Sequence, residues 1–438
     1  MERENKRLKK KAERELSRRI AIEKENKELK KRLRFYEGPN TPPSKLGFKE
    51  KPTDKKEPKK LGAPVGHPGF TRKTVVPSKV IEIGATTCPH CRSPLGKPAR
   101  VSKRIIEEIP EPLPVEVVQY NISEYDCPGC GKKVVARNPE CPRQGRFGVR
   151  FLSLIVFLQI FMRGVSRKIP FFLEYQNGVK VTPATCSNIL ERIAGVCQQE
   201  YDELKKKIRN EPVVYVDETS ISVMGKTHWI WVFRAEKEVV LAIRASRGSK
   251  VLEEILGKEY KGVVVCDGWS AYNMLRNAAL QRCWAHLIRE AKEYACTVRG
   301  KHLFKKLTSM FKEIKAFKKT KPIEETRKQK YDQMTTELDR LIKYYRRYPE
   351  LHKILTYLEN GGKNWFTCLL YENVEPTNNN AEQALREMVT LRNIIGAIRS
   401  QKLFKYENTC SLFATWKLKK ENTYQNLKKI ITQKYCMS

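Results

Sequence analysis

Two aspartates stand where acidic side chains are costly, next to apolar runs that are typical of buried strands. Asp217 follows the run VVYV and Asp267 follows the run GVVVC. A carboxylate in such a place needs a cation or hydrogen bonds to compensate for its lost hydration. A third candidate, Glu382, comes just after Asn378-Asn379-Asn380, which we expect to cap a helix, so Glu382 falls in the first turn of that helix. We expect the three carboxylates to meet.

Three carboxylates on two strands and a helix are a suitable donor set for a pair of Mg²⁺ ions, with Mn²⁺ as a substitute. Hard octahedral cations prefer oxygen ligands and keep open positions for a substrate. Two such ions, about 3.5–4 Å apart, hold the attacking and the leaving oxygen of an in-line phosphoryl displacement. One site of this kind can activate water to nick DNA and then activate a DNA 3′-hydroxyl for strand transfer.

Four cysteines predict a second, structural metal site. Cys88-Pro-His-Cys91 and Cys127-Pro-Gly-Cys130 are paired Cys-x-x-Cys motifs, and two such turns complete a four-thiolate Zn²⁺ site. The gap between the pairs exceeds the usual ~15–20 residues, and redox dithiols or plain β-turns are the alternatives. We expect strands at 105–109 and 115–125 to form a ribbon that joins the pairs, and we expect His90 and Cys141 to be bystanders.

The composition points to a polyanionic partner. The 438 residues carry a formal net charge of +37, and 40% of them are hydrophobic, so the chain can bury cores and is not wholly disordered. No apolar run reaches the ~18–20 residues that span a bilayer, and the first residues lack the apolar region of a signal peptide. We expect no membrane contact, a cytoplasmic location at the nucleoid of a prokaryotic cell, and DNA as the partner.

Differences in composition and hydrophobic pattern divide the chain into the segments of a multidomain α+β protein. Residues 1–37 have heptad spacing over Ile22, Asn26, Leu29 and Leu33, which predicts a coiled-coil dimerisation helix, with a single solvated basic helix as the alternative. Residues 38–80 form a basic Pro-rich linker, which either follows DNA phosphates or only solubilises the chain. Residues 81–141 hold the four-cysteine zinc ribbon.

Helices and strands then alternate toward the C-terminus. Residues 142–209 are predicted to be a helical, helix-turn-helix-like DNA-binding domain, with a simple helical hairpin as an equal alternative. Residues 210–402 form the α/β catalytic domain, with a Lys-rich helical insertion at about 297–360 that either holds DNA or is a solvated hairpin. Residues 403–438 are C-terminal helices.

Four further motifs make the chain recognisable in combination. They are VDET at 216–219, CDGWSAY at 266–272, CWAH at 283–286 and NNAEQALR at 379–386. Together with the order of coiled helix, Pro-rich tether with GHPG at 66–69 and four-cysteine module, they resemble the IS66-family transposases, DDE enzymes with an RNase H-like catalytic core. The resemblance covers nearly the whole length.

The resemblance implies a role for several residues. Asp217, Asp267 and Glu382 would be the DDE metal ligands, and Cys283 with His286 is similar to the C-x-x-H element of several DDE families. Arg386 and Arg392, on the helix of the glutamate, would contact phosphates.

Other residues near these motifs have plainer interpretations. Glu218 points away from Asp217 on a strand and is expected to be structural. His286 acts near the scissile phosphate or, with Cys283, braces the core. Trp269 and Trp284 are expected in the core, with platforms on which bases stack as the alternative.

The predicted function is that of a Mg²⁺-dependent DNA transposase. It would bind insertion-sequence ends, nick them hydrolytically and transfer their 3′-hydroxyls into target DNA, as a homodimer or larger homo-oligomer, with accessory transposition proteins as further candidate partners. Two alternatives remain: a catalytically inactive zinc-containing DNA-binding repressor, and an RNase H-like nuclease that acts on branched DNA.

Overall fold

The computed structural model describes residues 23, 26, 76–107 and 111–437, and the chain forms two compact units, Met1–Leu113 and Pro114–Ser438. Of the predicted coiled coil, only Glu23 and Asn26 are described, and both are helical. The rest of that helix and the Pro-rich linker up to residue 75 lie outside the described residues. No helix in the described ranges is long and apolar enough to cross a membrane.

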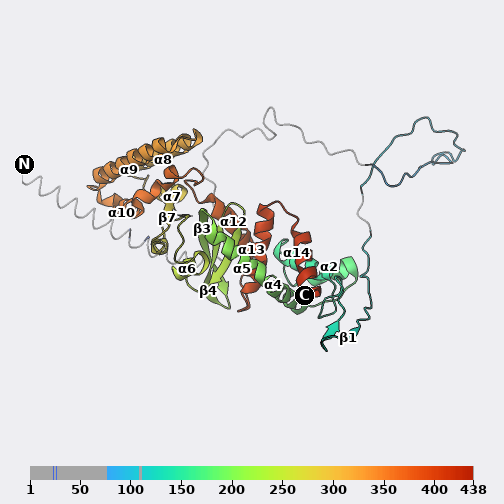
Figure 1. Ribbon diagram of the computed structural model, residues 1–438. Coiled ribbons are helices and arrows are strands. Elements are labelled where there is room, and N and C mark those ends of the chain that lie inside the picture. Colours follow the sequence, from blue (N-terminus) through green and yellow to red (C-terminus); the bar gives the residue numbers. More distant parts are fainter. Residues whose placement is uncertain (1–22, 24–25, 27–75, 108–110, 438) are drawn as a thin grey trace, which may run out of the picture. The chain divides into compact units, whose positions relative to one another are not determined.

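A five-stranded mixed sheet lies at the centre of the unit Pro114–Ser438 (Figure 1). Its strands are β3 (Val213–Val223), β4 (Lys226–Arg234), β5 (Val239–Arg244), β6 (Val263–Cys266) and β7 (Ala279–Arg282), in the order β5-β4-β3-β6-β7. The first three strands pair antiparallel, and β6 and β7 run parallel to β3. This mixed sheet with its helices agrees with the predicted α+β class.

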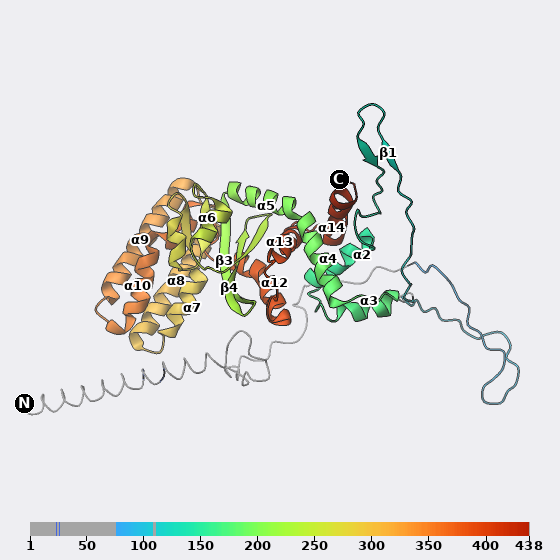
Figure 2. The ribbon, with the colours of Figure 1, turned by 90° about the horizontal axis from the view of Figure 1, so that it is seen from below.

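One group of helices precedes the sheet, and a second group is inserted after its last strand. The first group is α2 (Val149–Ile160), α3 (Ile169–Asn177), α4 (Pro183–Val196) and α5 (Gln198–Asn210). The second is α7 (Trp284–Glu293), α8 (Val298–Lys319), α9 (Glu324–Tyr345), α10 (His352–Gly361) and α11 (Thr367–Leu370). Figure 2 shows α2, α3 and α4 on one side of the sheet strands and α8, α9 and α10 on the other.

The remaining helices pack on and beside the sheet. They are α6 (Lys250–Leu256), α12 (Asn379–Ile395), α13 (Phe404–Leu418) and α14 (Thr423–Ile431), with short 3₁₀ turns at Ser270–Met274, Pro349–Leu351 and Gly362–Trp365 and a π turn at Thr432–Cys436. Helix α12 packs against β3 and β4, and α13 packs against β5 and α4. Helix α4 begins with a side-chain cap, because the Thr182 hydroxyl accepts a hydrogen bond from the Thr185 amide and Pro183 is the first helical residue.

Buried aromatic rings join the inserted helices to the sheet. Trp284, at the start of α7, is fully buried and stacks on Phe311 of α8 at 5.8 Å between ring centroids. Its indole N–H donates to the Trp365 carbonyl oxygen at 2.6 Å, and Trp365 itself is 1% exposed. Satisfied indole N–H groups let such large rings be buried without a polar penalty. The core is therefore continuous from the sheet into the insertion.

Side chains, rather than further strands, close both edges of the sheet. On β5, the amides of Val239, Leu241 and Ile243 donate to Thr415, Ser411 and Glu407, which are spaced four residues apart on α13. On β7, the Thr367 hydroxyl donates to the Leu280 carbonyl oxygen at 2.6 Å. Unpaired edge strands are sites of aggregation, and these contacts remove the open donors and acceptors.

The strands predicted at 105–109 and 115–125 are absent from the described residues 105–107 and 115–123. A short hairpin takes their place, with β1 (Glu124–Asp126) antiparallel to β2 (Lys133–Val135), and it lies around the second cysteine pair alone. Prolines at 112 and 114 lack the N–H groups that a ladder needs. Val117 is 90% exposed and has no apolar surface to pack against, so its segment gains nothing from pairing.

We predict that Ser411→Ala destabilises the protein by about 1–3 kcal/mol, because the buried Leu241 amide loses its acceptor. Urea unfolding measures the change. Thr356→Ala is the matched control: Thr356 also bonds the carbonyl oxygen four residues before it, but it is exposed, so its loss should cost less than about 0.5 kcal/mol. Equal, small effects of the two substitutions would contradict the proposed closure of the β5 edge.

Candidate active site

The two aspartates lie side by side at one level of the sheet. Strands β3 and β6 are parallel, with Tyr215 opposite Val265, so Asp217 and Asp267 each come two residues after this pair. Side chains two residues apart on a strand share a face, so Asp217 points to the same side of β3 as Tyr215. Asp217 is still within β3, whereas Asp267 is the first residue after β6.

Asn378 joins the helix of Glu382 to strand β3, next to Asp217. Its side-chain amide donates to the Val216 carbonyl oxygen at 2.7 Å, and its backbone N–H donates to the Cys283 sulfur at 3.1 Å. Asn378 stands at the N-cap position of α12, as expected of this run of asparagines, but its side chain bonds β3 instead of the first amides of the helix. Glu382 is in the first turn of α12 as predicted, and Asn378 ties this turn to the residue before Asp217.

The charges of Asp267 and Glu382 act on Asp217, although the ligand atoms of these three acids are not all within 4.8 Å of one another among the described residues. Burial, followed by the negative charges of Glu218, Asp267 and Glu382, raises the pKa of Asp217 to about 7, although the Glu218 amide donates to its Oδ1 at 3.0 Å. Like charges that disfavour one another's ionisation are what a bound cation relieves. Glu382 Oε1 is also buried and has no hydrogen-bond partner among the described residues. This oxygen-rich, under-compensated donor set fits a hard divalent ion.

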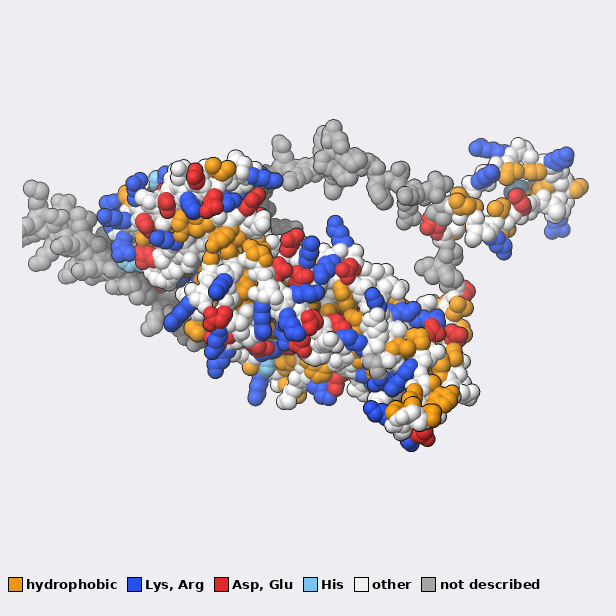
Figure 3. Space-filling view, in the orientation of Figure 1, with side chains coloured by type: hydrophobic (Ala, Val, Ile, Leu, Met, Phe, Trp, Pro, Cys, Tyr) orange, Lys and Arg blue, Asp and Glu red, His pale blue; other side chains and the backbone are white. Residues whose placement is uncertain are grey.

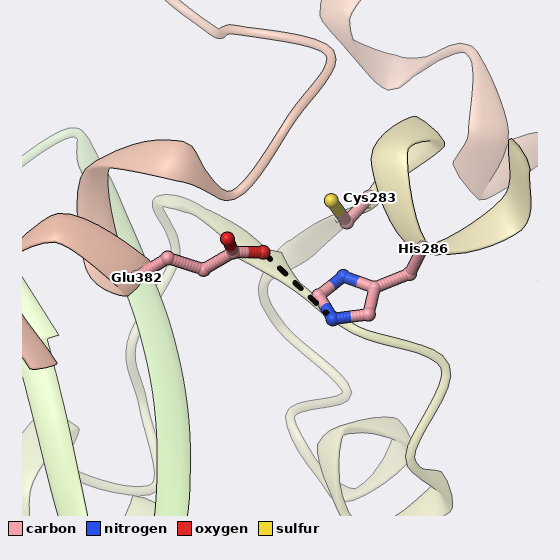
Figure 4. A group of neighbouring side chains, drawn as sticks. All are labelled: Cys283, His286 and Glu382. Carbon is pink, nitrogen blue, oxygen red and sulfur yellow. Dashed lines mark ion pairs between the residues drawn. The ribbon is translucent and has the colours of Figure 1, made fainter. Parts of the chain in front are cut away.

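Glu382 also borders a cysteine and a histidine (Figure 4). One ligand atom each from Cys283, His286 and Glu382 lies within 4.8 Å of the others, and His286 Nε2 is 3.8 Å from Glu382 Oε1. The other ring nitrogen, Nδ1, is buried without a described partner. Burial raises the pKa of the Cys283 thiol, so the sulfur is protonated unless a cation stabilises the thiolate. Sulfur and nitrogen donors suit a softer ion than Mg²⁺.

A buried arginine holds the loop that carries Asp267. Arg282 is 2% exposed, and its guanidinium donates to the carbonyl oxygens of Asp267 and Trp269 at 2.5 and 3.2 Å and to Asn273 Oδ1 at 2.6 Å. Charge-assisted hydrogen bonds of this kind are among the stronger ones in proteins. We did not predict this residue from the sequence, where an arginine at the end of a short strand is unremarkable.

Arg247 is a second residue that the sequence did not reveal. Its guanidinium lies 2.8 Å from Glu218 Oε1 and 3.9 Å from Asp267 Oδ2, so it offsets part of the negative charge. Glu218 also accepts a hydrogen bond from the Tyr272 hydroxyl at 2.7 Å. These contacts agree with the structural interpretation of Glu218.

The inserted helices contribute one residue directly to the site. Tyr357, on α10, packs so closely on Gly268 that a Cβ added there would lie 2.2 Å from the tyrosine ring. Burial and then the charge of Asp267 raise the pKa of Tyr357, which therefore stays neutral. Glycine at 268 lets the insertion touch the loop directly after Asp267.

The two cysteine pairs form matching turns, one in each unit. The Cys88 amide donates to the Ser93 carbonyl oxygen at 2.9 Å, and the Cys127 amide donates to that of Lys132 at 3.0 Å. In each turn the residue four after the first cysteine, Arg92 or Gly131, has a positive φ and donates back to that cysteine's carbonyl oxygen. Hydrogen bonds, chiefly from Ser93, lower the pKa of Cys91 to about 7, and backbone N–H groups lower that of Cys127. Both effects favour thiolates, the form that binds metals.

A model of the transposase IS66 family matches residues 144–405, which is more than half of the chain. The chain belongs to the IS66 transposase family. A search of curated proteins finds no match. The matched range of this IS66-family transposase contains Asp217, Asp267 and Glu382 and excludes both cysteine pairs. Membership makes the chain a DNA-processing enzyme, with DNA as its partner and a divalent metal as its requirement.

The remaining predicted residues of the transposase have different surroundings. Arg386 is exposed, with no side-chain partner among the described residues, and is free to meet a phosphate. Arg392 instead donates to the Thr219 hydroxyl at 2.9 Å and to the Ser220 carbonyl oxygen, which ties α12 to β3. Trp284 is in the core as expected, but the same expectation for Trp269 is wrong, because this residue is 39% exposed.

We predict that Asp217→Asn stabilises the transposase above pH 7 when no divalent ion is added. The folded chain holds a proton on Asp217 up to about pH 7, whereas an unfolded aspartate loses it near pH 3.9, so stability falls as pH rises through this window. We expect the variant to gain about 1–3 kcal/mol over the native chain between pH 4 and pH 8.

Urea unfolding at pH 4, 6 and 8 measures this gain. Asp339→Asn, at an exposed position on α9, is the control and should show no pH-dependent difference. A variant of Asp217 that is no more stable than the native chain at pH 8 would contradict the crowding of the three acids.

Proposed function

We propose that this IS66-family protein binds the ends of its insertion sequence, nicks them and transfers the 3′-hydroxyl ends into target DNA by a two-metal DDE mechanism. The observation that supports the proposal is the parallel register of β3 and β6, which brings Asp217 and Asp267 to one level, with Glu382 on the helix that Asn378 ties to β3. Burial, Glu218, Asp267 and Glu382 all raise the pKa of Asp217. We assign these three residues as ligands of two Mg²⁺ ions, which Mn²⁺ can replace. When bound, such ions polarise the phosphate and stabilise the attacking and leaving oxygens.

The chain's own residues prepare this chemistry by fixing the ligands. Arg282 holds the backbone of Asp267, and Asn378 holds the helix of Glu382 against β3. Carboxylates fixed in advance need little reorganisation when the reaction begins. We propose that Cys283 and His286 act as auxiliary residues beside Glu382, and that Arg386 guides a DNA phosphate.

The sheet supports an RNase H-like core. Three antiparallel strands are followed by two strands parallel to the first, and the acids lie on the two adjacent central strands, β3 and β6. Helices α8 to α10 interrupt this core between β7 and α12, as a helical insertion in the catalytic domain would.

The surface charge supports DNA as the substrate. Figure 3 shows Lys and Arg side chains over the region of α8 and α9. Helix α8 exposes the lysines Lys301, Lys305, Lys306, Lys312, Lys315 and Lys319. Contacts of this kind give sequence-independent affinity that falls steeply with salt. We infer that the insertion holds DNA and that α2 to α4 form the DNA-binding helical domain. We also infer that the N-terminal helix pairs two subunits and, with them, the two ends of the insertion sequence.

We predict that Asp217→Asn, Asp267→Asn and Glu382→Gln each lower strand transfer at least ~10³-fold while DNA binding is kept, because each removes a metal ligand but no DNA contact. A gel assay with end oligonucleotides and Mg²⁺ measures nicking and joining, and a mobility shift measures binding. Asp339→Asn serves as the control.

The same assay separates the two alternative functions. A native chain that binds ends but never cuts them would indicate a repressor, and one that cuts branched junctions but not linear ends would indicate a junction nuclease. Near-native activity in any of the three variants would contradict the ligand assignment.

We also propose that Cys88, Cys91, Cys127 and Cys130 share one structural Zn²⁺ ion, on the support of their matching turns. The purified chain should then contain one zinc per subunit at this module, and Cys88→Ser or Cys127→Ser should each release it, because a four-thiolate site loses its closed shell with any ligand. Elemental analysis of the protein measures the zinc. Cys141→Ser is the control and should keep the ion; full zinc in Cys88→Ser would mean that the pairs do not share it.

A further inference from the structure

Trp269 differs from the other tryptophans in its exposure. All six tryptophans lie in the described residues; Trp231, Trp284 and Trp365 are at most 1% exposed, whereas Trp269 is 39% exposed. Large aromatic side chains gain most from burial, so one left in contact with solvent needs an explanation. Its position, two residues after Asp267, places it beside the proposed metal site.

The side chain of Trp269 is fixed in place. The guanidinium of Arg247 lies over its ring, 4.2 Å from the centroid, and also 4.7 Å from the centroid of Trp229. The indole N–H donates to the Arg247 carbonyl oxygen at 3.3 Å. One face of the ring is therefore covered by protein, and the exposed part of the side chain is held rigidly.

The backbone of Trp269 is fixed to the catalytic loop as well. Its N–H donates to Asp267 Oδ1 at 2.9 Å, and its carbonyl oxygen accepts from Arg282 at 3.2 Å. Its ring thus keeps a constant position relative to the Asp267 carboxylate. A binding surface that is ordered in advance loses little entropy when it takes a ligand.

Charge argues against a phosphate as the ligand of this surface. The cation beside the ring, Arg247, is already paired with the buried carboxylate of Glu218 at 2.8 Å. What remains is a flat apolar ring, and the flat apolar group that DNA brings to this site is a base. Bases stack on aromatic side chains only when they are free of their own duplex stack, which DNA-modifying enzymes achieve by unpairing them.

We infer that Trp269 is a stacking platform for an unpaired base of the cleaved DNA, next to the scissile phosphate. This inference rests on the proposed function, because it requires DNA at Asp267. The platform lowers the cost of opening the base pair at the element end, and so brings the scissile phosphate to the carboxylates. Base stacking on an aromatic ring contributes enough for its loss to slow cutting about 5- to 150-fold.

The test uses end oligonucleotides from the DNA flanking the gene, with 2-aminopurine as the base next to the scissile phosphate, placed opposite a mismatch so that the probe is unpaired before the protein binds. Stacking on a tryptophan quenches this fluorophore. In Ca²⁺, added to allow binding without cutting, we expect the native chain to quench the probe and Trp269→Ala to leave it bright, with Trp269→Phe in between. Tyr371→Ala removes another exposed aromatic ring and should behave like the native chain.

Cutting in Mg²⁺ provides the second readout. Trp269→Ala should cut the paired end about 5- to 150-fold more slowly and recover most of this loss on an end whose terminal pair is already mismatched. Equal probe fluorescence in the native chain and Trp269→Ala, or a loss that the mismatch does not reduce, would overturn the inference and leave Trp269 a support for Asp267.

Failure of the proposed function has a separate signature. A native chain that binds the end and quenches the probe but never cuts would refute the catalytic proposal while leaving the platform in place. If the native chain binds the end without quenching the probe, the stacking platform is refuted, whether or not cutting occurs.

Discussion

The partial burial of Asp217 near other acidic side chains is the constraint on which the rest of the structure depends. Asp217 is surrounded by Glu218, Asp267 and Glu382, and a chain without other interactions would separate these charges. Backbone amides donate to two of these carboxylates, Glu218 to Asp217 and Trp269 to Asp267, and further hydrogen bonds hold the backbone around them. Arg282 binds backbone oxygens behind Asp267, and Asn378 binds the carbonyl oxygen before Asp217. The acids are thus kept close and only partly neutralised, which is the state that a divalent ion stabilises.

The insertion is part of this arrangement rather than an appendage. Trp284 begins the helix that also carries His286, and it stacks on α8 within the shared core. Tyr357 reaches from α10 to Gly268. If bound DNA moved the inserted helices, the loop directly after Asp267 would therefore move with them. This contact gives the enzyme a physical route by which DNA binding on the basic helices can influence the ligand geometry.

The sequence predicted the parts of the site that follow from local pattern. An acid after a run of valines, and a glutamate after asparagines, are signals that can be found without a structure. The parallel pairing of β3 and β6, which brings the aspartates to one level, was not predicted. The roles of Arg247 and Arg282 could not be predicted in this way, because such a cation is recognised by its partners, and these lie in other elements of the fold.

The wrong predictions have the same origin. Apolar residues at 115–122 suggested a strand, but a strand forms only where a partner and a surface to cover are available. Trp269 was expected in the core because tryptophan is usually buried, and its exposure depends on the loop that Arg282 holds. Asn378 stands at the cap of its own helix, as expected, but β3 competes successfully for its side chain.

Anomalous diffraction from a crystal soaked in Mn²⁺ tests the central claim most directly. The account predicts manganese peaks bounded by the carboxylates of Asp217, Asp267 and Glu382. Manganese bound away from the two aspartates, or a Glu382 carboxylate that coordinates an ion only together with Cys283 and His286, would contradict it.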